Sequence, residues 1–88
     1  MPVPLYFLYV VRCADGTLYT GITTDVDRRV EEHNSTRSKA GAKYTRARQP
    51  VALVYSKPYK DRSAAAIAEA ALKKLSRKEK LAIISLQP

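Results

Sequence analysis

Residues 5–13, LYFLYVVRC, form a run of aromatic, β-branched and other apolar residues that only Arg12 interrupts. Side chains along a strand alternate between the two faces of a sheet, so a strand with one solvated face is polar at every second position. This run is apolar at both sets of positions, which predicts a strand covered on both faces. A chain of 88 residues can bury one modest core, so we place this strand at the centre of the sheet.

Residues 14–16, Ala-Asp-Gly, are a turn signal, and residues 17–22 predict a strand that returns beside the first. A two-residue turn would put Tyr9 and Tyr19 on opposite faces of the sheet, whereas a three-residue loop puts both on one face. We favour the three-residue loop because it needs a left-handed residue at its end, and Gly16 supplies one.

The three-residue loop also fixes the partners across the hairpin. Cys13 pairs with Thr17 in this register, and Gly21 lies opposite Tyr9. The register thus puts a glycine, which has no side chain, beside Tyr9.

Residues 24–34 predict a helix, with Thr24 and Asp25 as suitable N-terminal caps. At about 100° per residue, the positions that should face the sheet share one arc: Val26, Arg29, Val30 and His33. A charged side chain is seldom buried without a partner. Either Arg29 reaches out from the rim of the core and His33 is a satisfied edge histidine, or this edge opens into a cleft that holds an anion. Arg28 should point to solvent and serves as an internal control.

The charge balance points to an anionic partner. Sixteen Lys and Arg stand against eight Asp and Glu, a formal net charge of +8, which is typical of proteins that bind nucleic acid, anionic membranes or acidic proteins. Residues 35–49 contain five basic residues, no acidic one and one interleaved aromatic: Arg37, Lys39, Lys43, Arg46 and Arg48 with Tyr44. This pattern predicts a loop that contacts nucleic-acid phosphates, the alternative being a solvated basic loop.

Other function classes are excluded by what the sequence lacks. No run of about 18 apolar residues occurs, so we expect no membrane span, and the N-terminus has no signal-peptide pattern. Cys13 is the single cysteine and His33 the single histidine, which are too few ligands for a structural zinc site. A chain without a disulfide suits a reducing cytoplasm, where we expect this protein.

The second half of the chain predicts a third strand at 51–56, with 57–60 as a connector, and two more helices. Asp61 or Ser63 can cap a helix that runs to about residue 75, with a predicted core stripe of Ala64, Ile67, Ala68, Ala71, Leu72 and Leu75. Ser76 and Glu79 form a capping box that starts the last helix. The order β-β-α-β-α-α predicts one α+β domain over residues 1–88, with an antiparallel sheet and a core at about 5–80.

Two charged features stand out in these helices. Glu69 is the one ionisable residue among the alanines that precede Lys73, and it flanks the core stripe. It is either an ordinary surface glutamate or a carboxylate that other groups can approach closely. A second basic cluster comprises Lys73, Lys74, Arg77, Lys78 and Lys80. As a solvated helix surface, this cluster needs no ligand.

Five elements of the chain, in order and at matching spacing, resemble the GIY-YIG nuclease domain: Phe7-Leu8-Tyr9, Tyr19-Thr20-Gly21, Arg29, His33 and Glu69. Residues 18–29 and 41–46 are still more similar to its small stand-alone bacterial branch. The similarity covers about residues 5–80. The chain departs from the family pattern at Phe7, where the first motif has glycine, at Thr20, and in having no asparagine after Asn34.

The resemblance implies a three-stranded antiparallel sheet flanked by helices, and cleavage of DNA phosphodiester bonds with one divalent metal ion, Mg²⁺ or Mn²⁺. It implies that Tyr9 or Tyr19 acts as general base or positions water. It further implies that Arg29 steadies the phosphate, that Glu69 holds the metal and that His33 lies near the attacking water. These residue types suit the chemistry, because hydrolysis needs an activated water and stabilisation of charge on the phosphate.

The residues alone leave several alternatives open. Tyr9, Tyr19 and His33 all remain candidates for the base, and a non-catalytic nucleic-acid-binding domain remains the second hypothesis. A role in DNA repair or recombination, with selection of DNA structure or targeting by a protein partner, would fit a domain without a separate reader module. RNA also remains a candidate substrate.

Overall fold

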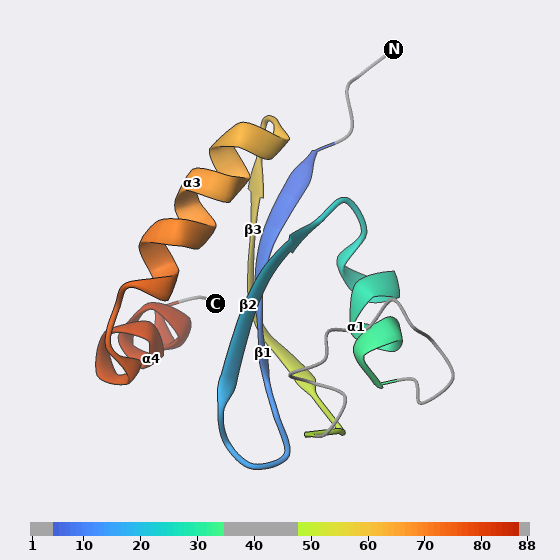
Figure 1. The fold of residues 1–88 in the computed structure, drawn as a ribbon, viewed down its shortest axis with the longest axis vertical. Coiled ribbons are helices and arrows are strands. Elements are labelled where there is room, and N and C mark those ends of the chain that lie inside the picture. The colour runs from blue at the N-terminus through green and yellow to red at the C-terminus, as the bar shows by residue number, and fades with distance from the viewer. Residues whose placement is uncertain (1–4, 35–47, 87–88) are drawn as a thin grey trace.

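The computed structural model describes residues 5–34 and 48–86 (Figure 1). Its elements follow the predicted order: β1 (Tyr6–Arg12), β2 (Leu18–Thr23), α1 (Val26–Asn34), β3 (Ala52–Tyr59), α3 (Arg62–Lys73) and α4 (Arg77–Ser85). The three strands form one antiparallel sheet in the order β2-β1-β3, so the strand that is apolar on both faces is central, as its sequence predicts.

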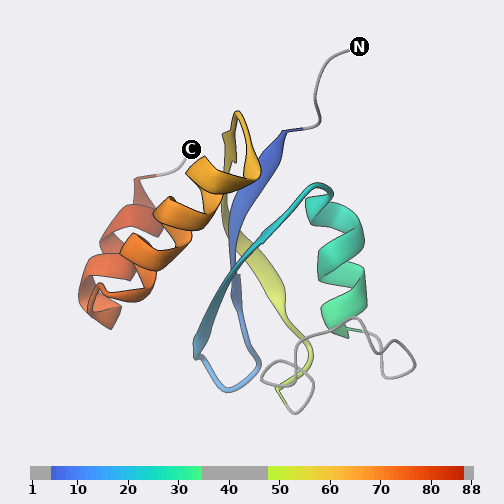
Figure 2. The ribbon, with the colours of Figure 1, turned by 45° about the horizontal axis from the view of Figure 1, so that its top comes forward.

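The helices cover the sheet from both sides, with α1 on one face and α3 and α4 on the other (Figures 1 and 2). Alternate residues of β1 therefore enter two separate cores. Tyr9 and Val11 pack on the α1 side, and Leu8 and Val10 pack on the side of α3 and α4. This double coverage is the physical reason for the uninterrupted apolar run in β1.

The β1–β2 hairpin has the predicted three-residue loop. The backbone N–H of Cys13 donates to the carbonyl of Thr17 at 2.8 Å, and Gly16 adopts the left-handed conformation with φ of 85°. In this register Tyr9 pairs with Gly21, as predicted. The side chains of Tyr9 and Tyr19 consequently lie on the same face of the sheet, towards α1.

Each helix starts at a sequence-encoded cap. Asp25 accepts a hydrogen bond from the backbone N–H of Arg28 at 3.1 Å, and Asp61 caps α3 by accepting from Ala64 at 2.8 Å. Ser76 starts α4 with a complete capping box. From these caps α1 and α3 both run towards the end of the sheet that carries the β1–β2 turn (Figures 1 and 2). None of the described helices has the length and apolar composition that crossing a bilayer requires.

Two predicted features of the second half are wrong. The stretch 57–60 is not a connector, because β3 continues to Tyr59 and pairs with the start of β1. Pro58 is tolerated there because β3 is an edge strand. Ile67 and Ala71 do not belong to the predicted core stripe, since Ile67 is 69% exposed and Ala71 is exposed too, while Ala65 is fully buried.

Candidate active site

A buried pair of aromatic residues forms the centre of the candidate site. The hydroxyl of Tyr9 lies 2.7 Å from Nε2 of His33, although the two residues are 24 positions apart in the chain. Tyr9 is 1% exposed and His33 is fully buried. His33 is therefore a satisfied core histidine that reaches no solvent directly, and Tyr9 is the group through which it connects to the site.

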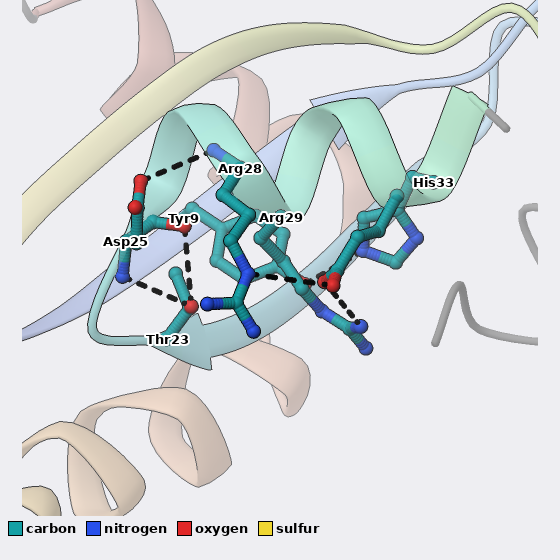
Figure 3. A network of polar contacts seen from close by, with 7 residues as sticks. Tyr9, Thr23, Asp25, Arg28, Arg29 and His33 are labelled. Atoms are coloured by element: carbon teal, nitrogen blue, oxygen red, sulfur yellow. Dashed lines mark hydrogen bonds and ion pairs between the residues drawn. The ribbon is translucent and has the colours of Figure 1, made fainter. Parts of the chain in front are cut away.

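Arg29 joins this pair from the first half of α1. Its Nε donates to the hydroxyl of Tyr9 at 3.4 Å, and its side chain is 24% exposed. The neighbouring Arg28 is 74% exposed, as the helical arc predicts. One guanidinium is thus held against the buried phenol with part of its surface open, while the other extends into solvent (Figure 3).

A carboxylate that the sequence did not single out organises both arginines. Glu32 contacts Nη1 of Arg29 through Oε1 at 3.3 Å and Nε of Arg28 through Oε2 at 3.6 Å. The dashed lines from the two guanidinium groups in Figure 3 mark these ion pairs. Glu32 is only about one-fifth exposed, so solvent screens its contact with Arg29 less than it screens a contact on an open surface.

Tyr19 completes the group on the α1 face of the sheet. Its ring meets the ring of His33 edge-on, with 5.2 Å between the ring centroids, and it remains partly exposed. The ring of Tyr9 also lies beside His33, at 5.8 Å. Tyr9 and His33 therefore form an inner pair, and Tyr19 and Arg29 form an outer pair that is partly exposed.

The protonation states follow from burial and from the nearby guanidinium. Burial lowers the pKa of His33, and the positive charge of Arg29 lowers it further, while Glu32 acts in the opposite direction. Burial raises the pKa of the Tyr9 phenol, although Arg29 opposes that shift. At neutral pH His33 is accordingly neutral and Tyr9 is protonated. Because Arg29 already donates to the phenol oxygen, we assign Tyr9 as the donor and Nε2 of His33 as the acceptor of the hydrogen bond between them.

This burial predicts a pH-dependent stability. The ordinary pKa of histidine is 6.5, and that of folded His33 is lower, so below pH 6.5 the unfolded chain takes up a proton that the folded chain does not. The free energy of unfolding should be constant above about pH 7 and fall towards pH 5.5, by at most about 1.4 kcal/mol per pH unit. Urea denaturation across this range measures the slope. The variant His33→Gln should lose that slope, and an unchanged slope in the variant would contradict the assignment.

Gly21 makes room for the inner pair. A Cβ atom at this position would lie 2.6 Å from the hydroxyl oxygen of Tyr9 and 2.8 Å from Cζ of its ring. Both distances are shorter than any ordinary van der Waals contact, so a larger residue must displace the ring of Tyr9 from His33. Glycine at this position is therefore required by the close approach of the phenol rather than by backbone conformation.

We expect Gly21→Ala to lower the free energy of unfolding by about 1–3 kcal/mol, as overpacking of a filled core does. Denaturation of the variant measures this loss. The same substitution in a Tyr9→Leu background should be less harmful, because both the hydroxyl and the ring carbons that the new methyl group meets are gone. Equal losses in the two backgrounds would show that the clash with the phenol is not the cause.

Glu69 lies on α3, which packs against the other face of the sheet. Its side chain is 24% exposed, and its Oε2 lies 3.8 Å from Nζ of Lys73. It makes no hydrogen bond or ion pair with the other four candidates in the part of the chain that the structure describes. Its charge nevertheless contributes to the raised pKa of Tyr9, behind burial as the main cause.

The candidate nucleic-acid contacts fall mostly outside the described residues. Arg37, Lys39, Lys43, Tyr44 and Arg46 lie in 35–47, and only Arg48 is described. Nε of Arg48 lies 3.0 Å from Oδ2 of Asp15, and its carbonyl accepts from the N–H of Ala14 at 2.9 Å. Arg48 is therefore fixed to the β1–β2 turn.

The described residues on either side of 35–47 meet at the C-terminal end of α1. The amide of Asn34 pairs with the backbone of Val51 in both directions, at 2.6 and 3.0 Å, and Nε2 of Gln49 donates to the carbonyl of His33 at 2.7 Å. Sequence reasoning missed these contacts, and it also missed Glu32. Only the position of Glu32, four residues after Arg28 and three after Arg29, offered a signal for ion pairing.

No group of three or more His, Cys, Asp or Glu side chains within residues 5–34 and 48–86 is placed to hold a metal ion. A site for Mg²⁺ does not require one, because Mg²⁺ is commonly held by one or two carboxylates together with substrate phosphates and water. Glu69 is a partly exposed carboxylate of the kind that this ion binds. Among the described residues, Glu69 is therefore the candidate ligand for the metal ion that the sequence predicts.

Comparison with known proteins gives consistent matches over nearly the whole chain. The family model described as the GIY-YIG catalytic domain matches residues 5–82. The UPF0213 protein DP2720 of Desulfotalea psychrophila is 54% identical over 92% of this chain and 72% of its own length. The UPF0213 protein SAG0778 of Streptococcus agalactiae is 52% identical over 93% of this chain and 89% of its own. The solution structure of the UPF0213 protein BH0048 from Bacillus halodurans has a TM-score of 0.60 and 42% identity, covering 94% of this chain and 85% of that one.

Proposed function

The chain belongs to the GIY-YIG family of nuclease catalytic domains, and we propose that it is a DNA endonuclease that uses one divalent metal ion, Mg²⁺ or Mn²⁺. The observation that supports this most is the division into an inner and an outer pair. A buried Tyr9–His33 pair supports a partly exposed tyrosine and a partly exposed arginine on one face of the sheet. A domain that only bound phosphates would not need two phenols and an imidazole behind one guanidinium.

Arg29 is proposed to bind the scissile phosphate. A guanidinium is permanently charged and offers a planar set of N–H donors that matches two phosphate oxygens. Nε of Arg29 is directed to Tyr9 and Nη1 to Glu32, so the group is already oriented before substrate arrives. Such preorganised donors stabilise the charge that develops on the phosphate during attack.

Tyr19 is proposed to orient the attacking water, since burial withdraws Tyr9 and His33 from direct contact with solvent. At neutral pH a phenol acts mainly as a hydrogen-bonding group, because its reference pKa is about 10. In the reaction the water oxygen forms a bond to phosphorus as the bond to the leaving oxygen breaks. A proton is lost from the water and one is taken up by the leaving oxygen. Tyr9 and His33 act here as positioning residues for Arg29 and Tyr19.

Glu69 is the residue that would hold the metal ion. When bound, such an ion stabilises charge on the phosphate oxygens and on the leaving group. Glu69 offers one carboxylate on α3. Its ion pair with Lys73 is long, at 3.8 Å, and the Lys73 side chain is 53% exposed, so the pair is weak enough for a metal ion to replace it.

Incubation with duplex, single-stranded, flap and junction DNA, and with matched RNA, tests the proposal. With Mg²⁺ or Mn²⁺ the protein should cut at least one DNA, with a preference for structure, and EDTA should stop the reaction. The second hypothesis, a non-catalytic binding domain, predicts salt-dependent binding without metal-dependent cleavage of any of these substrates. That result would overturn the endonuclease proposal. A role in DNA repair or recombination is part of the proposal if branched DNA is the preferred substrate.

A further inference from the structure

The connection between α3 and α4 carries a dense positive charge that the candidate site does not use. We call it the basic turn, and it consists of Lys73, Lys74, Arg77, Lys78 and Lys80. All of these except Lys80 are exposed. Glu79 is the one acidic residue within residues 73–80, and its carboxylate accepts a hydrogen bond from the backbone N–H of Ser76 in the capping box.

Helix stability explains only two of these five charges. Lys73 and Lys74 lie at the C-terminal end of α3, where the helix dipole favours cations. Arg77 and Lys78 are the first two residues of α4, where the same effect disfavours them. A folding role thus accounts for the first two cations and opposes the second two.

Ion pairing within the chain does not compensate for this placement. Lys73 is the one member of the basic turn that forms an ion pair among the described residues, with Glu69. Lys74, Arg77, Lys78 and Lys80 have no acidic partner within the same ranges. Cations that are held against the helix dipole without a carboxylate are suited to an anion from another molecule.

The position of the basic turn indicates which anion. Lys73 is paired at 3.8 Å with Glu69, the proposed metal ligand, so the basic turn begins beside the residue that would bind the ion at the scissile phosphate. The turn also lies towards the end of the sheet that carries the β1–β2 loop (Figures 1 and 2). The exposed cations of the basic turn therefore lie beside the residue that would bind the ion.

From this placement we propose that the basic turn binds backbone phosphates of duplex DNA next to the scissile phosphate. This inference rests on the proposed endonuclease function and extends its substrate surface to the α3 side of the sheet. An anionic membrane is less suitable, because a membrane-bound helix needs a broad apolar face beside its cations. The exposed leucines of this region, Leu81 and Leu86, lie about 140° apart around the helical axis and form no such face.

The double variant Arg77→Gln/Lys78→Gln tests the proposal, measured by the salt dependence of its affinity for a duplex. If each side chain contacts one phosphate, the slope of log K against log salt should become less steep by about 1.8, and the affinity should fall roughly tenfold or more at 0.1 M salt. The melting temperature should stay constant or rise, because two cations leave a helix N-terminus. Weaker binding together with an undiminished melting temperature would separate recognition from folding.

Lys57→Gln/Lys60→Gln is the charge-matched control, because these lysines lie near the start of β1, at the opposite end of the sheet. In this control variant, the slope of log K against log salt should change by less than about 0.5. Equal effects of the two double variants would overturn the proposal and leave only a general charge effect. A wild-type chain that binds no duplex would overturn this proposal alone, whereas failure to bind any of the duplex, single-stranded, flap and junction DNAs would overturn the endonuclease function as well. An unchanged DNA slope, combined with lost binding to phosphatidylserine vesicles, would show a membrane surface instead.

Discussion

Replacing Arg29 with alanine should reduce the rate of DNA cleavage roughly 10²–10³-fold, which is typical for removal of one preorganised donor to a developing anion. Arg28→Ala, by contrast, should reduce it less than about fivefold. The two residues are adjacent and carry the same charge, so long-range electrostatics affects both alike. Only Arg29 contacts Tyr9, and only Arg28 is mostly exposed. Single-turnover cleavage with Mg²⁺ measures the difference.

Arg29→Lys distinguishes geometry from charge at the same position. Lysine keeps the positive charge but not the planar fork that can serve Tyr9, Glu32 and a phosphate together. We therefore expect the cleavage rate of Arg29→Lys to exceed that of Arg29→Ala by less than about tenfold. Equal losses from Arg28→Ala and Arg29→Ala would show that the orientation of α1 does not select the phosphate ligand.

Glu69→Gln should lower the cleavage rate by roughly 10³-fold or more, because charge stabilisation by a bound metal ion contributes several kcal/mol. Affinity for DNA should be unchanged or slightly higher, since the substitution removes one negative charge. Glutamine keeps the shape of the side chain, so the packing of α3 on β1 and β2 should survive. Cleavage and fluorescence-anisotropy binding, measured on the same substrate, separate the two effects.

Glu31→Gln provides the matched control for Glu69→Gln. Glu31 is exposed on α1, and its substitution changes the net charge by the same amount. It should retain the wild-type rate within about twofold, as surface charges usually do. Cleavage by Glu69→Gln within about tenfold of the wild-type rate would contradict a role for this carboxylate in holding the metal ion.

The first half of the fold could be predicted because rigid geometry determines it. The alternation of a strand, together with the need for a left-handed Gly16, sets the register of the hairpin and puts both tyrosines on one face. The helical period then directs Arg29 and His33 to the sheet and Arg28 to solvent. These local rules suffice to place four of the five candidate residues.

The errors occur where local rules leave a choice. In α3 the many alanines permit several rotations of the helix, and the one adopted buries Ala65 and exposes Ile67. Local turn signals at 57–60 were overridden because pairing with β1 extends β3. The depth of each side chain could not be predicted either. Sequence alone treats Tyr9 and Tyr19 alike, whereas the packed core buries Tyr9 and leaves Tyr19 at the edge.

The central claim is that one metal-bound phosphate is served both by Glu69 on α3 and by Tyr19 and Arg29 on the α1 face. Paramagnetic broadening of backbone amide signals by Mn²⁺, in a complex with uncleavable DNA, tests it most directly. We predict that amides around Glu69 and around Tyr19, Gly21 and Arg29 broaden together at low Mn²⁺, and that Glu69→Gln removes both effects. Broadening around Glu69 alone, or broadening that persists in Glu69→Gln, would contradict a shared active site.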